Sequence, residues 1–326
     1  MTERLSDKLK EYLSLSQGRD VDIKDIRTFL KIEPGSNDDD NLRKLMSRNL
    51  VEQKVVTPSG KGDGRYHVIT QIKPVSVYGR ERRPPIRLNF PRCFDSMLEL
   101  PFAGDIVTRE GDLILIAGVS NFGKTALCLN FLSENIEANP VLMGNEYTTI
   151  DNEPSSRFLN RLDNMDWVQW DNDGHDRFTL LPVREDFAEH IVKDKINIID
   201  WINLDEAYLI SGVMERIKKA VGKGIGILVV QKGEGTDYGR GKQYTKDFTD
   251  VEILLDPFGK EEVRMSLGKV KESKRSLFGQ HYAFRLEKGV RIMNFREIKR
   301  CPLCGGSKNY KGADCDNCSG KGMVDL

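Results

Sequence analysis

Hydrophobic and polar positions follow two different periods along the chain. Between residues 89 and 298, short β-prone runs such as LILIAG, INIID and GIGILVVQ are separated by amphipathic segments of helical period, and VEILLD, EVRMSLGKV and HYAFRLE follow. Strands that alternate with helices form a parallel sheet covered by helices on both faces. The pattern therefore predicts an α/β core with a mostly parallel twisted sheet.

Residues 1–70 have a helical period followed by a short β pattern. Leu5, Leu9 and Leu13 recur at helical spacing, a second amphipathic segment begins after Asp22, and a third runs from 41 to 50. The run VVTPSGKGDGRYHVI then reads as two strands joined by a Gly-rich basic turn. Three helices and a hairpin resemble a winged helix-turn-helix.

In a winged helix the third helix enters the major groove of DNA and the hairpin contacts the backbone. The resemblance implies DNA contacts from the third helix and the wing, namely Arg43, Lys44, Arg48, Lys61 and Arg65. The alternative is a winged helix that binds protein, because three consecutive acids at 38–40 suit a helix N-terminus but would repel DNA.

The stretch GVSNFGKT has the spacing of a phosphate-binding P-loop between an apolar strand and an amphipathic helix. Glycines let backbone N–H groups point at the phosphates, and the helix adds its positive end. Lys124 is expected to bind the β- and γ-phosphates and Thr125 to bind Mg²⁺. The predicted nucleotide-binding residues are Gly118, Val119, Ser120, Asn121, Phe122, Gly123, Lys124 and Thr125.

Hydrolysis of a bound nucleotide needs two further carboxylates. Asp200 follows the apolar run INII and is the predicted second magnesium ligand. Glu146, after the strand PVLM, is the predicted residue that orients or deprotonates water, with Glu153 and Glu206 as competitors.

These motifs together resemble the RecA-like ATPases, and among them the DnaB-type hexameric helicases and their phage relatives. The resemblance rests on LPFAGDIVTREGDLILIAGVSNFGKTALCLNFL, on Glu146 and on INIIDWINL. It implies that Gln231 senses the γ-phosphate. It also implies that Lys269 and Lys271, in place of a Lys-x-Arg pair, reach the nucleotide of a neighbouring subunit, although lysine lacks the forked donors of arginine.

The same resemblance gives a role to the Gly-rich run KGEGTDYGRGKQYTKDF after Gln231. In RecA-fold motors a loop at this place lines a central channel and holds single-stranded DNA, and cations on a flexible backbone suit that role. The implied contacts are Lys232, Arg240 and Lys242. An ordinary surface loop is the alternative.

Four of the six cysteines form two C-x-x-C pairs near the C-terminus, Cys301 with Cys304 and Cys315 with Cys318. Four thiolates at this spacing can close a tetrahedral zinc site, and so short a segment could not bury a core without one. The Gly-rich spacing resembles the zinc ribbons of DnaJ and primases, and the nearby lysines slightly favour nucleic acid over a protein partner. Cys128 reads as a buried, inert thiol.

Charge and composition set the remaining expectations. The chain has 326 residues and 50 acidic against 50 basic side chains, but the run from 73 to 92 and the tail from 269 onward are basic. A solvated linker explains the first run as well as a ligand does. No apolar run is long enough to cross a bilayer, and there is no signal-peptide core, so we expect a cytoplasmic protein, in the host cytoplasm if a phage encodes it.

These features predict four parts: a winged helix (1–70), a basic Pro-rich linker (71–88), a RecA-like ATPase core (89–298) and a zinc ribbon (299–326). The favoured function is an ATP-dependent DNA motor, a helicase or translocase in replication, recombination or repair, with ATP, Mg²⁺ and Zn²⁺ as cofactors. Single- or double-stranded DNA, copies of the chain in a hexameric ring or filament, and replication or repair proteins are the expected partners. A nucleotide-switched initiator or helicase loader and a strand-exchange recombinase are the alternatives, and a small-molecule kinase ranks last.

Overall fold

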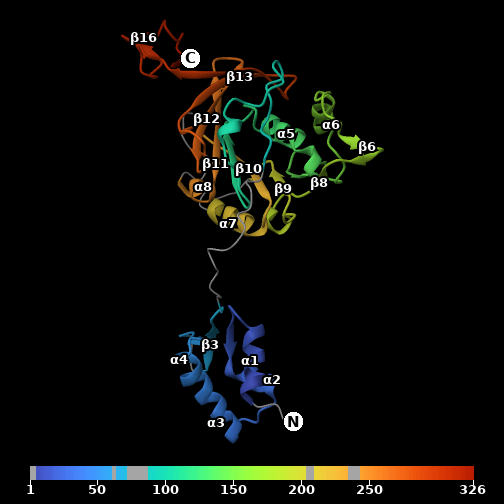
Figure 1. Ribbon diagram of the computed structural model, residues 1–326, viewed down its shortest axis with the longest axis vertical. Helices are drawn as coiled ribbons and strands as arrows, with labels where there is room; N and C mark the ends of the chain where they lie inside the picture. The colour runs from blue at the N-terminus through green and yellow to red at the C-terminus, as the bar shows by residue number, and fades with distance from the viewer. Residues whose placement is uncertain (1–4, 61–63, 72–86, 203–208, 234–242) are drawn as a thin grey trace. The chain divides into compact units, whose positions relative to one another are not determined.

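The computed structural model describes residues 5–60, 64–71, 87–202, 209–233 and 243–326, without the side chains of residues 243 and 244. The chain divides into two compact units, an N-terminal unit of residues 1–82 and a C-terminal unit of residues 83–326 (Figure 1). The predicted linker falls largely on residues 72–86, which lie outside the described residues. The division into four parts stays a prediction.

The N-terminal unit packs helices against a small antiparallel sheet whose strands are ordered β1-β3-β2. Its elements are α1 (Leu5–Leu15), β1 (Asp20–Asp22), α2 (Ile23–Leu30), α3 (Asn37–Lys44), a π-helical turn (Leu45–Asn49), α4 (Leu50–Glu52), β2 (Val56–Pro58) and β3 (Arg65–Val68). The predicted start of the second helix is confirmed, because the Asp22 side chain caps α2 by accepting the N–H of Lys24. These are the elements that a winged helix needs, and that identity stays a prediction.

The third helix begins earlier than the apolar pattern indicated, with Ser36 as its N-cap. Asp39 in its first turn is buried, where it accepts hydrogen bonds from Arg27 Nε at 2.6 Å and from the Gly35 N–H at 2.9 Å. One of the three acids thus links α3 to α2.

The C-terminal unit is built on one ten-stranded sheet with the order β17-β14-β13-β12-β11-β4-β10-β9-β5-β8 (Figure 1). Its strands are β4 (Leu113–Gly118), β5 (Val141–Met143), β8 (Thr179–Leu181), β9 (Ile196–Ile199), β10 (Ile225–Gln231), β11 (Val251–Phe258), β12 (Glu262–Val270), β13 (His281–Glu287), β14 (Arg291–Arg300) and β17 (Met323–Asp325). Strands from β8 to β11 pair in parallel, and β11 to β17 pair antiparallel. The α/β class is confirmed, but the sheet is mixed rather than mostly parallel, because hairpin-type pairings extend it beyond β11.

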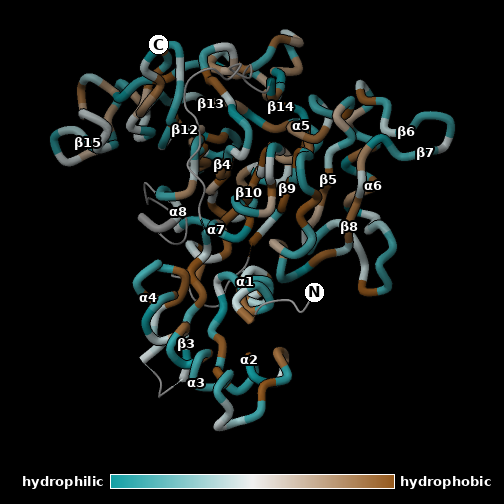
Figure 2. Tube along the Cα trace, turned by 60° about the horizontal axis from the view of Figure 1, so that its bottom comes forward, coloured by the Kyte–Doolittle hydropathy of each residue, from teal (hydrophilic) through white to brown (hydrophobic). Residues whose placement is uncertain are grey.

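Helices cover both faces of the parallel part. The helices are α5 (Lys124–Glu134), α6 (Ser156–Asp163), α7 (Ile210–Ala220) and α8 (Gln243–Phe248), with 3₁₀ turns at Ala103–Asp105, Ile136–Ala138 and Phe187–Glu189. In β4, Ile114 and Ile116 pack with the buried face of α5, whereas Leu113 and Leu115 pack with that of α7. Because both faces are covered, β4, β9 and β10 are predominantly hydrophobic (Figure 2) and are buried along their length except at Gln231.

Two short hairpins leave this framework: β6 (Asp171–Asn172) with β7 (His175–Asp176), and β15 (Asn309–Tyr310) with β16 (Ala313–Asp314). The second hairpin lies between the two C-x-x-C pairs, and β17 after it joins the main sheet beside β14. The cysteine segment is therefore tied to the sheet at both of its ends.

Candidate phosphate-binding and four-cysteine sites

The P-loop connects the end of β4 to the start of α5. Asn121 and Gly123 have positive φ angles of 65° and 83°, so the loop curls back on itself before the helix begins. A Cβ on Gly118 would lie 2.9 Å from Lys124 Cγ and 3.0 Å from Leu255 Cβ. A side chain at position 118 would therefore displace the stem of Lys124.

Lys124 lies inside the loop. It is 8% exposed, and its Nζ donates a hydrogen bond to the Val119 carbonyl at 2.8 Å. Burial lowers the pKa of Lys124, and the nearby carboxylates Asp200 and Glu146 oppose that shift. The ammonium is thus positioned beside the backbone that would surround a phosphate.

Asp200 follows β9 and is almost fully buried beneath the P-loop. Its Oδ2 accepts a hydrogen bond from the Tyr147 hydroxyl at 2.7 Å, and its Oδ1 has no hydrogen-bond partner among the described residues. Burial raises the pKa of Asp200, while hydrogen bonds from Tyr147 and Thr125 oppose that shift. A buried carboxylate oxygen without a donor, next to a hydroxyl, fits a magnesium ion.

A close approach of two backbones makes room for this carboxylate. A Cβ on Gly144, just after β5, would lie 1.7 Å from the Asp200 carbonyl oxygen, so only glycine fits at this position. The sequence predicts only Glu146 as a functional residue after this strand, and it does not single out Gly144 or Tyr147.

Glu146 lies in the turn after β5, 3.6 Å from the Arg161 guanidinium of α6. Both side chains line one cavity of about 330 Å³. The cavity is also lined by Ser120, Asn121, Gly123, Lys124, Thr125, Asp200, Trp201 and Gln231. Arg161 was not predicted, because one arginine on an amphipathic helix carries no sequence signal of a site.

Gln231 ends β10 directly beside Gly118, with which it is in register. The structure thus brings together Lys124, Thr125, Glu146, Asp200 and Gln231 from four separate segments of the chain. Of the two competitors for Glu146, Glu153 does not line this cavity and Glu206 lies outside the described residues.

Lys269 and Lys271 do not line this cavity. Lys271 Nζ lies 2.8 Å from Asp250 Oδ1, and Lys269 Nζ donates to the Lys246 carbonyl. Partial burial lowers the pKa of Lys269, whereas the hydrogen bond to Asp250 raises that of Lys271. Their reach into a neighbouring subunit stays a prediction.

The predicted DNA contact of Lys232 is wrong for this structure. The Lys232 N–H donates to the Gly118 carbonyl at 3.1 Å, which draws the residue into the sheet edge. Its side chain is fully buried, with Nζ 2.6 Å from Asp256 Oδ1. A buried ammonium paired to a buried carboxylate cannot reach a phosphate of DNA. Arg240 and Lys242 lie outside the described residues.

The predicted DNA contacts of the N-terminal unit are exposed where the structure describes them. Arg43 lies 3.6 Å from Asp39 and Arg65 lies 3.5 Å from Asp22, and both side chains remain more than half exposed. Lys44 and Arg48 are also exposed, and Lys61 lies outside the described residues. The DNA role of this set stays a prediction.

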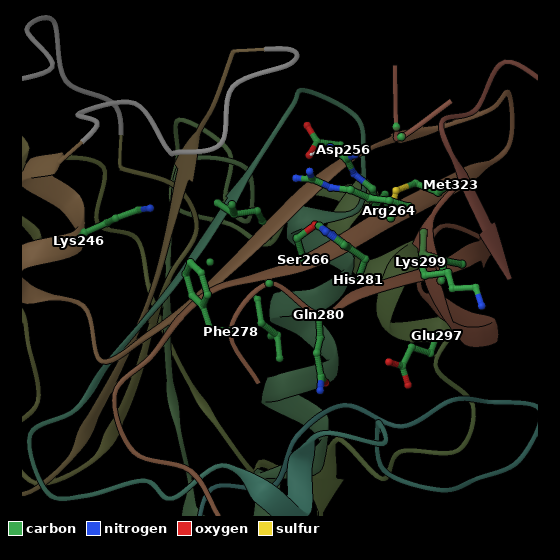
Figure 3. Close-up of a pocket in the computed structure, with 18 residues that line it drawn as sticks. Lys246, Asp256, Arg264, Ser266, Phe278, Gln280, His281, Glu297, Lys299 and Met323 are labelled. Atoms are coloured by element: carbon green, nitrogen blue, oxygen red, sulfur yellow. Dashed lines mark hydrogen bonds and ion pairs between the residues drawn. The ribbon is translucent and has the colours of Figure 1, made fainter. Parts of the chain in front are cut away.

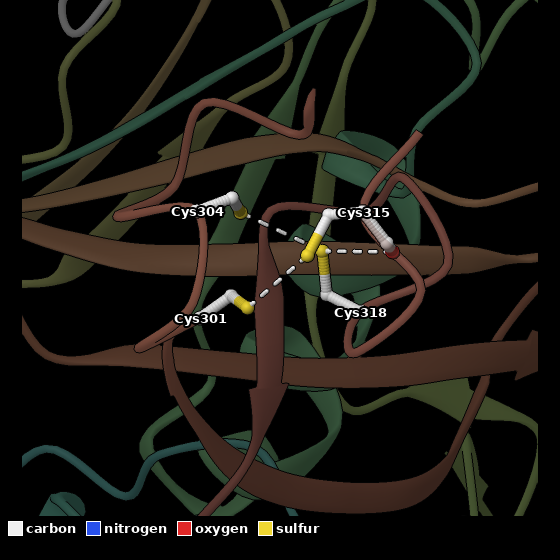
Figure 4. A group of neighbouring side chains, drawn as sticks. All are labelled: Cys301, Cys304, Cys315 and Cys318. Atoms are coloured by element: carbon white, nitrogen blue, oxygen red, sulfur yellow. Dashed lines mark hydrogen bonds between the residues drawn. The ribbon is translucent and has the colours of Figure 1, made fainter. Parts of the chain in front are cut away.

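The four predicted cysteine ligands form one cluster (Figure 4). All four Sγ atoms lie within 4.8 Å of one another, with Cys301 to Cys315 at 3.8 Å and Cys304 to Cys318 at 3.7 Å. Four sulfurs bound tetrahedrally to zinc, each about 2.3 Å from the ion, would be about 3.8 Å apart. The spacing therefore fits a structural zinc ion.

Hydrogen bonds to the sulfurs support the same assignment. The Asn317 amide donates to Cys301 Sγ and the Gly322 N–H donates to Cys318 Sγ, both at 3.2 Å. Hydrogen bonds, of which that from Asn317 is the strongest, lower the pKa of Cys301 to about 6, whereas burial raises the pKa of Cys315 to about 11. Such donors stabilise thiolates, which are the form of cysteine that binds metal. In contrast, Cys128 is fully buried in the core, and burial raises its pKa well above the usual value.

The chain is similar to solved structures but matches no protein family. No protein-family model and no curated protein matches the chain. A KaiC-like protein of the hyperthermophilic archaeon Pyrococcus horikoshii has a similar solved structure, with 18% identity and a TM-score of 0.44. The match covers 64% of this chain and 97% of that one. A likeness at this identity and TM-score does not establish a function. Among the described residues no helix is long and apolar enough for a membrane span.

Proposed function

We propose that the chain is a magnesium-dependent nucleoside triphosphatase. The observation that carries the proposal is the unpartnered Oδ1 of buried Asp200 in the same cavity as Lys124 and Thr125. Lys124 already offsets part of the charge on Asp200, but without a ligand the buried Oδ1 has no hydrogen bond to compensate its desolvation, which costs about 1–3 kcal/mol. A metal bound to a phosphate chain supplies that compensation.

Each residue of the cavity has a separate task in this proposal. The loop amides and Lys124 would hold the β- and γ-phosphates, and the Thr125 hydroxyl and Asp200 would hold Mg²⁺. When bound, Mg²⁺ neutralises charge on the phosphate oxygens. Glu146 would orient a water toward the γ-phosphorus and accept its proton as the bond to the β-phosphate breaks. Gln231 would contact the γ-phosphate and transmit its presence or absence to β10.

Nucleotide binding and hydrolysis test this proposal together. Lys124→Ala should lower the affinity for Mg²⁺-ATP about a hundredfold, because charge-assisted hydrogen bonds to two phosphates are lost. Lys223→Ala, at an exposed position after α7, is the matched control and should bind normally. Calorimetric titration with a non-hydrolysable ATP analogue measures the affinity. Unchanged binding by Lys124→Ala would refute the assignment of the loop.

The finer proposal is that hydrolysis drives a DNA motor of RecA-like type, working as a ring or filament. The sequence resemblance supports it, as do the exposed cations of the N-terminal unit and the absence of Lys269 and Lys271 from the cavity of their own chain. ATP turnover stimulated by single strands would support a motor, and an unwinding assay would follow. Slow turnover indifferent to single strands, with duplex binding retained, would favour the initiator or loader. Light scattering with and without ATP measures the oligomeric state.

We further propose that the four cysteines hold one Zn²⁺. A mercurial that binds the cysteine sulfurs, added in the presence of a zinc-sensitive dye, should displace one equivalent of Zn²⁺ per chain. Cys304→Ser should lower the zinc content to well below one, because three sulfurs cannot close the tetrahedral site. Full zinc occupancy in Cys304→Ser would contradict this ligand set.

A further inference from the structure

Two adjoining cavities lie along the antiparallel half of the main sheet, where it meets the cysteine segment. Their volumes are about 790 Å³ and about 750 Å³, and Asp256 and Arg264 line both of them. Each is more than twice as large as the cavity of about 330 Å³ at the P-loop and shares no lining residue with it. We call the two together the β11–β14 groove.

Among the charged residues that line the groove, cations outnumber acids. Its basic residues are Lys246, Lys260, Arg264, Lys299, Arg300, Lys308 and Lys321, against the acids Asp256 and Glu297. Asp256 is already neutralised by buried Lys232. Lys260, Lys299 and Lys308 are exposed and form no ion pair with any other described residue. The groove therefore carries excess positive charge, which favours an anionic ligand.

Arg264 lies at the junction of the two cavities. Its Nη2 donates to Asp256 Oδ2 at 2.9 Å, which fixes the guanidinium. Its Nε is buried and has no hydrogen-bond partner among the described residues. The guanidinium is thus held at the groove, where the exposed 28% of the side chain can contact a phosphate.

An aromatic side chain completes the groove. Phe278, between β12 and β13, is 74% exposed, and Figure 3 shows it near Lys246 on one side of the larger cavity, across from Lys299. An exposed aromatic ring at the wall of a basic cavity offers a face on which a flat partner can stack. A nucleobase is such a partner, and stacking on an aromatic ring needs an unpaired base.

We propose that the β11–β14 groove binds single-stranded nucleic acid, with phosphates on the Arg264 and Lys299 side and a base stacked on Phe278. The cations come from four segments and span two cavities, so a strand of several nucleotides fits them better than a free phosphate does. The proposal goes beyond the proposed function, because binding at the groove needs neither ATP nor hydrolysis.

The first experiment measures binding of a fluorescein-labelled 20-nucleotide oligothymidylate to the full, zinc-containing chain without nucleotide. Lys260→Ala/Lys299→Ala should lower the affinity about tenfold, and the slope of log K against log salt should become shallower by about 1.4, or about 0.7 for each lost phosphate contact. Lys219→Ala/Lys223→Ala removes equal charge from exposed positions outside the groove and should change the affinity less than twofold. An equal loss of affinity in both double-lysine variants would overturn the proposal.

The second experiment locates the strand. Phe278→Ala should weaken binding about tenfold, and the tryptophan emission of Phe278→Trp should be quenched when the strand is added. Binding without quenching, or a duplex that competes as well as the single strand, would overturn the stacking site. Failure of any strand to bind would also overturn it and leave an acidic protein as the occupant.

Basal ATP hydrolysis separates this proposal from the proposed function. Both double-lysine variants should keep the wild-type rate, because none of the four lysines lines the cavity at the P-loop. Loss of strand binding with normal hydrolysis would overturn the groove alone, and loss of hydrolysis in Lys124→Ala with normal strand binding is the expected converse.

Discussion

Asp200 and Asp256 are both buried carboxylates toward the carboxyl ends of parallel strands, β9 and β11, in the sheet that carries the P-loop, and they differ in what surrounds them. Asp256 lies 2.6 Å from Lys232 and 2.9 Å from Arg264, so two cations of the chain neutralise it. Asp200 receives a hydroxyl from Tyr147 and keeps Oδ1 without a partner among the described residues. Asp256 is therefore ion-paired within the protein, whereas Asp200 forms no ion pair with a described residue, although Oδ1 of each carboxylate lacks a hydrogen-bond partner among those residues.

The difference shows that burial of a charge does not by itself mark a site. Both residues follow apolar, β-prone runs, INII and VEILL, and look alike in the sequence. What separates them is the partner, which is brought to Asp256 from a neighbouring strand and withheld from Asp200.

The largest expected effect is on hydrolysis in Asp200→Asn. We expect the turnover rate to fall about 10²- to 10³-fold, because the amide cannot neutralise a divalent cation. The unfolding free energy should stay within about 1 kcal/mol of wild type or rise, because a buried charge is removed. Asp256→Asn is the control for a buried carboxylate and should keep turnover per folded molecule while losing stability. Hydrolysis retained by Asp200→Asn would remove the metal role of Asp200.

The next effect is on stability in Lys232→Met. Removing one partner of a buried ion pair should lower the unfolding free energy by about 3 kcal/mol, measured by urea denaturation. Lys223→Met, exposed and outside the sheet, should change it by less than about 0.5 kcal/mol. In Lys232→Met/Asp256→Asn part of the loss should return. If Lys232→Met kept full stability but lost DNA binding, our correction of its role would be wrong.

A smaller effect is expected from Arg161→Ala. The guanidinium lies 3.6 Å from Glu146 and positions that carboxylate in the cavity, so its loss should lower turnover about fivefold, or about 1 kcal/mol, as expected for a half-exposed pair. The apparent KM for ATP should change less than twofold. Arg157→Ala, exposed on the same helix, is the control, and Arg161→Lys should recover part of the rate. Equal losses from Arg157→Ala would show a general effect on α6.

The smallest effect concerns pH. Because burial raises the pKa of Asp200 above 3.8, the folded state binds this proton more tightly than the unfolded state does. The associated stability is present below pH 3.8 and is lost as pH rises through the raised folded value. In apo protein the stability of Asp200→Asn relative to wild type should therefore increase with pH over that window. A difference in unfolding free energy between Asp200→Asn and wild type that is the same at every pH would contradict the raised pKa.

The features that could be predicted from the sequence alone are those that depend on residues close together in the chain. The P-loop spacing located Gly118 to Thr125, the apolar runs located β4, β9, β10 and β11 to within a few residues, and the C-x-x-C spacing located the cysteine cluster. These patterns work because turn geometry, strand burial and ligand spacing are set over about ten residues.

Contacts between side chains from distant segments could be read only from the folded chain. Lys232 is buried against Asp256 and is not at the surface, and Arg161 lies beside Glu146. The groove between β11–β14 and the cysteine segment likewise depends on the fold. The physical reason is that the partner of a charged group determines whether the group is buried, exposed or free for a ligand. That partner is set by strand order and packing, which the local pattern of hydrophobic and polar residues does not specify.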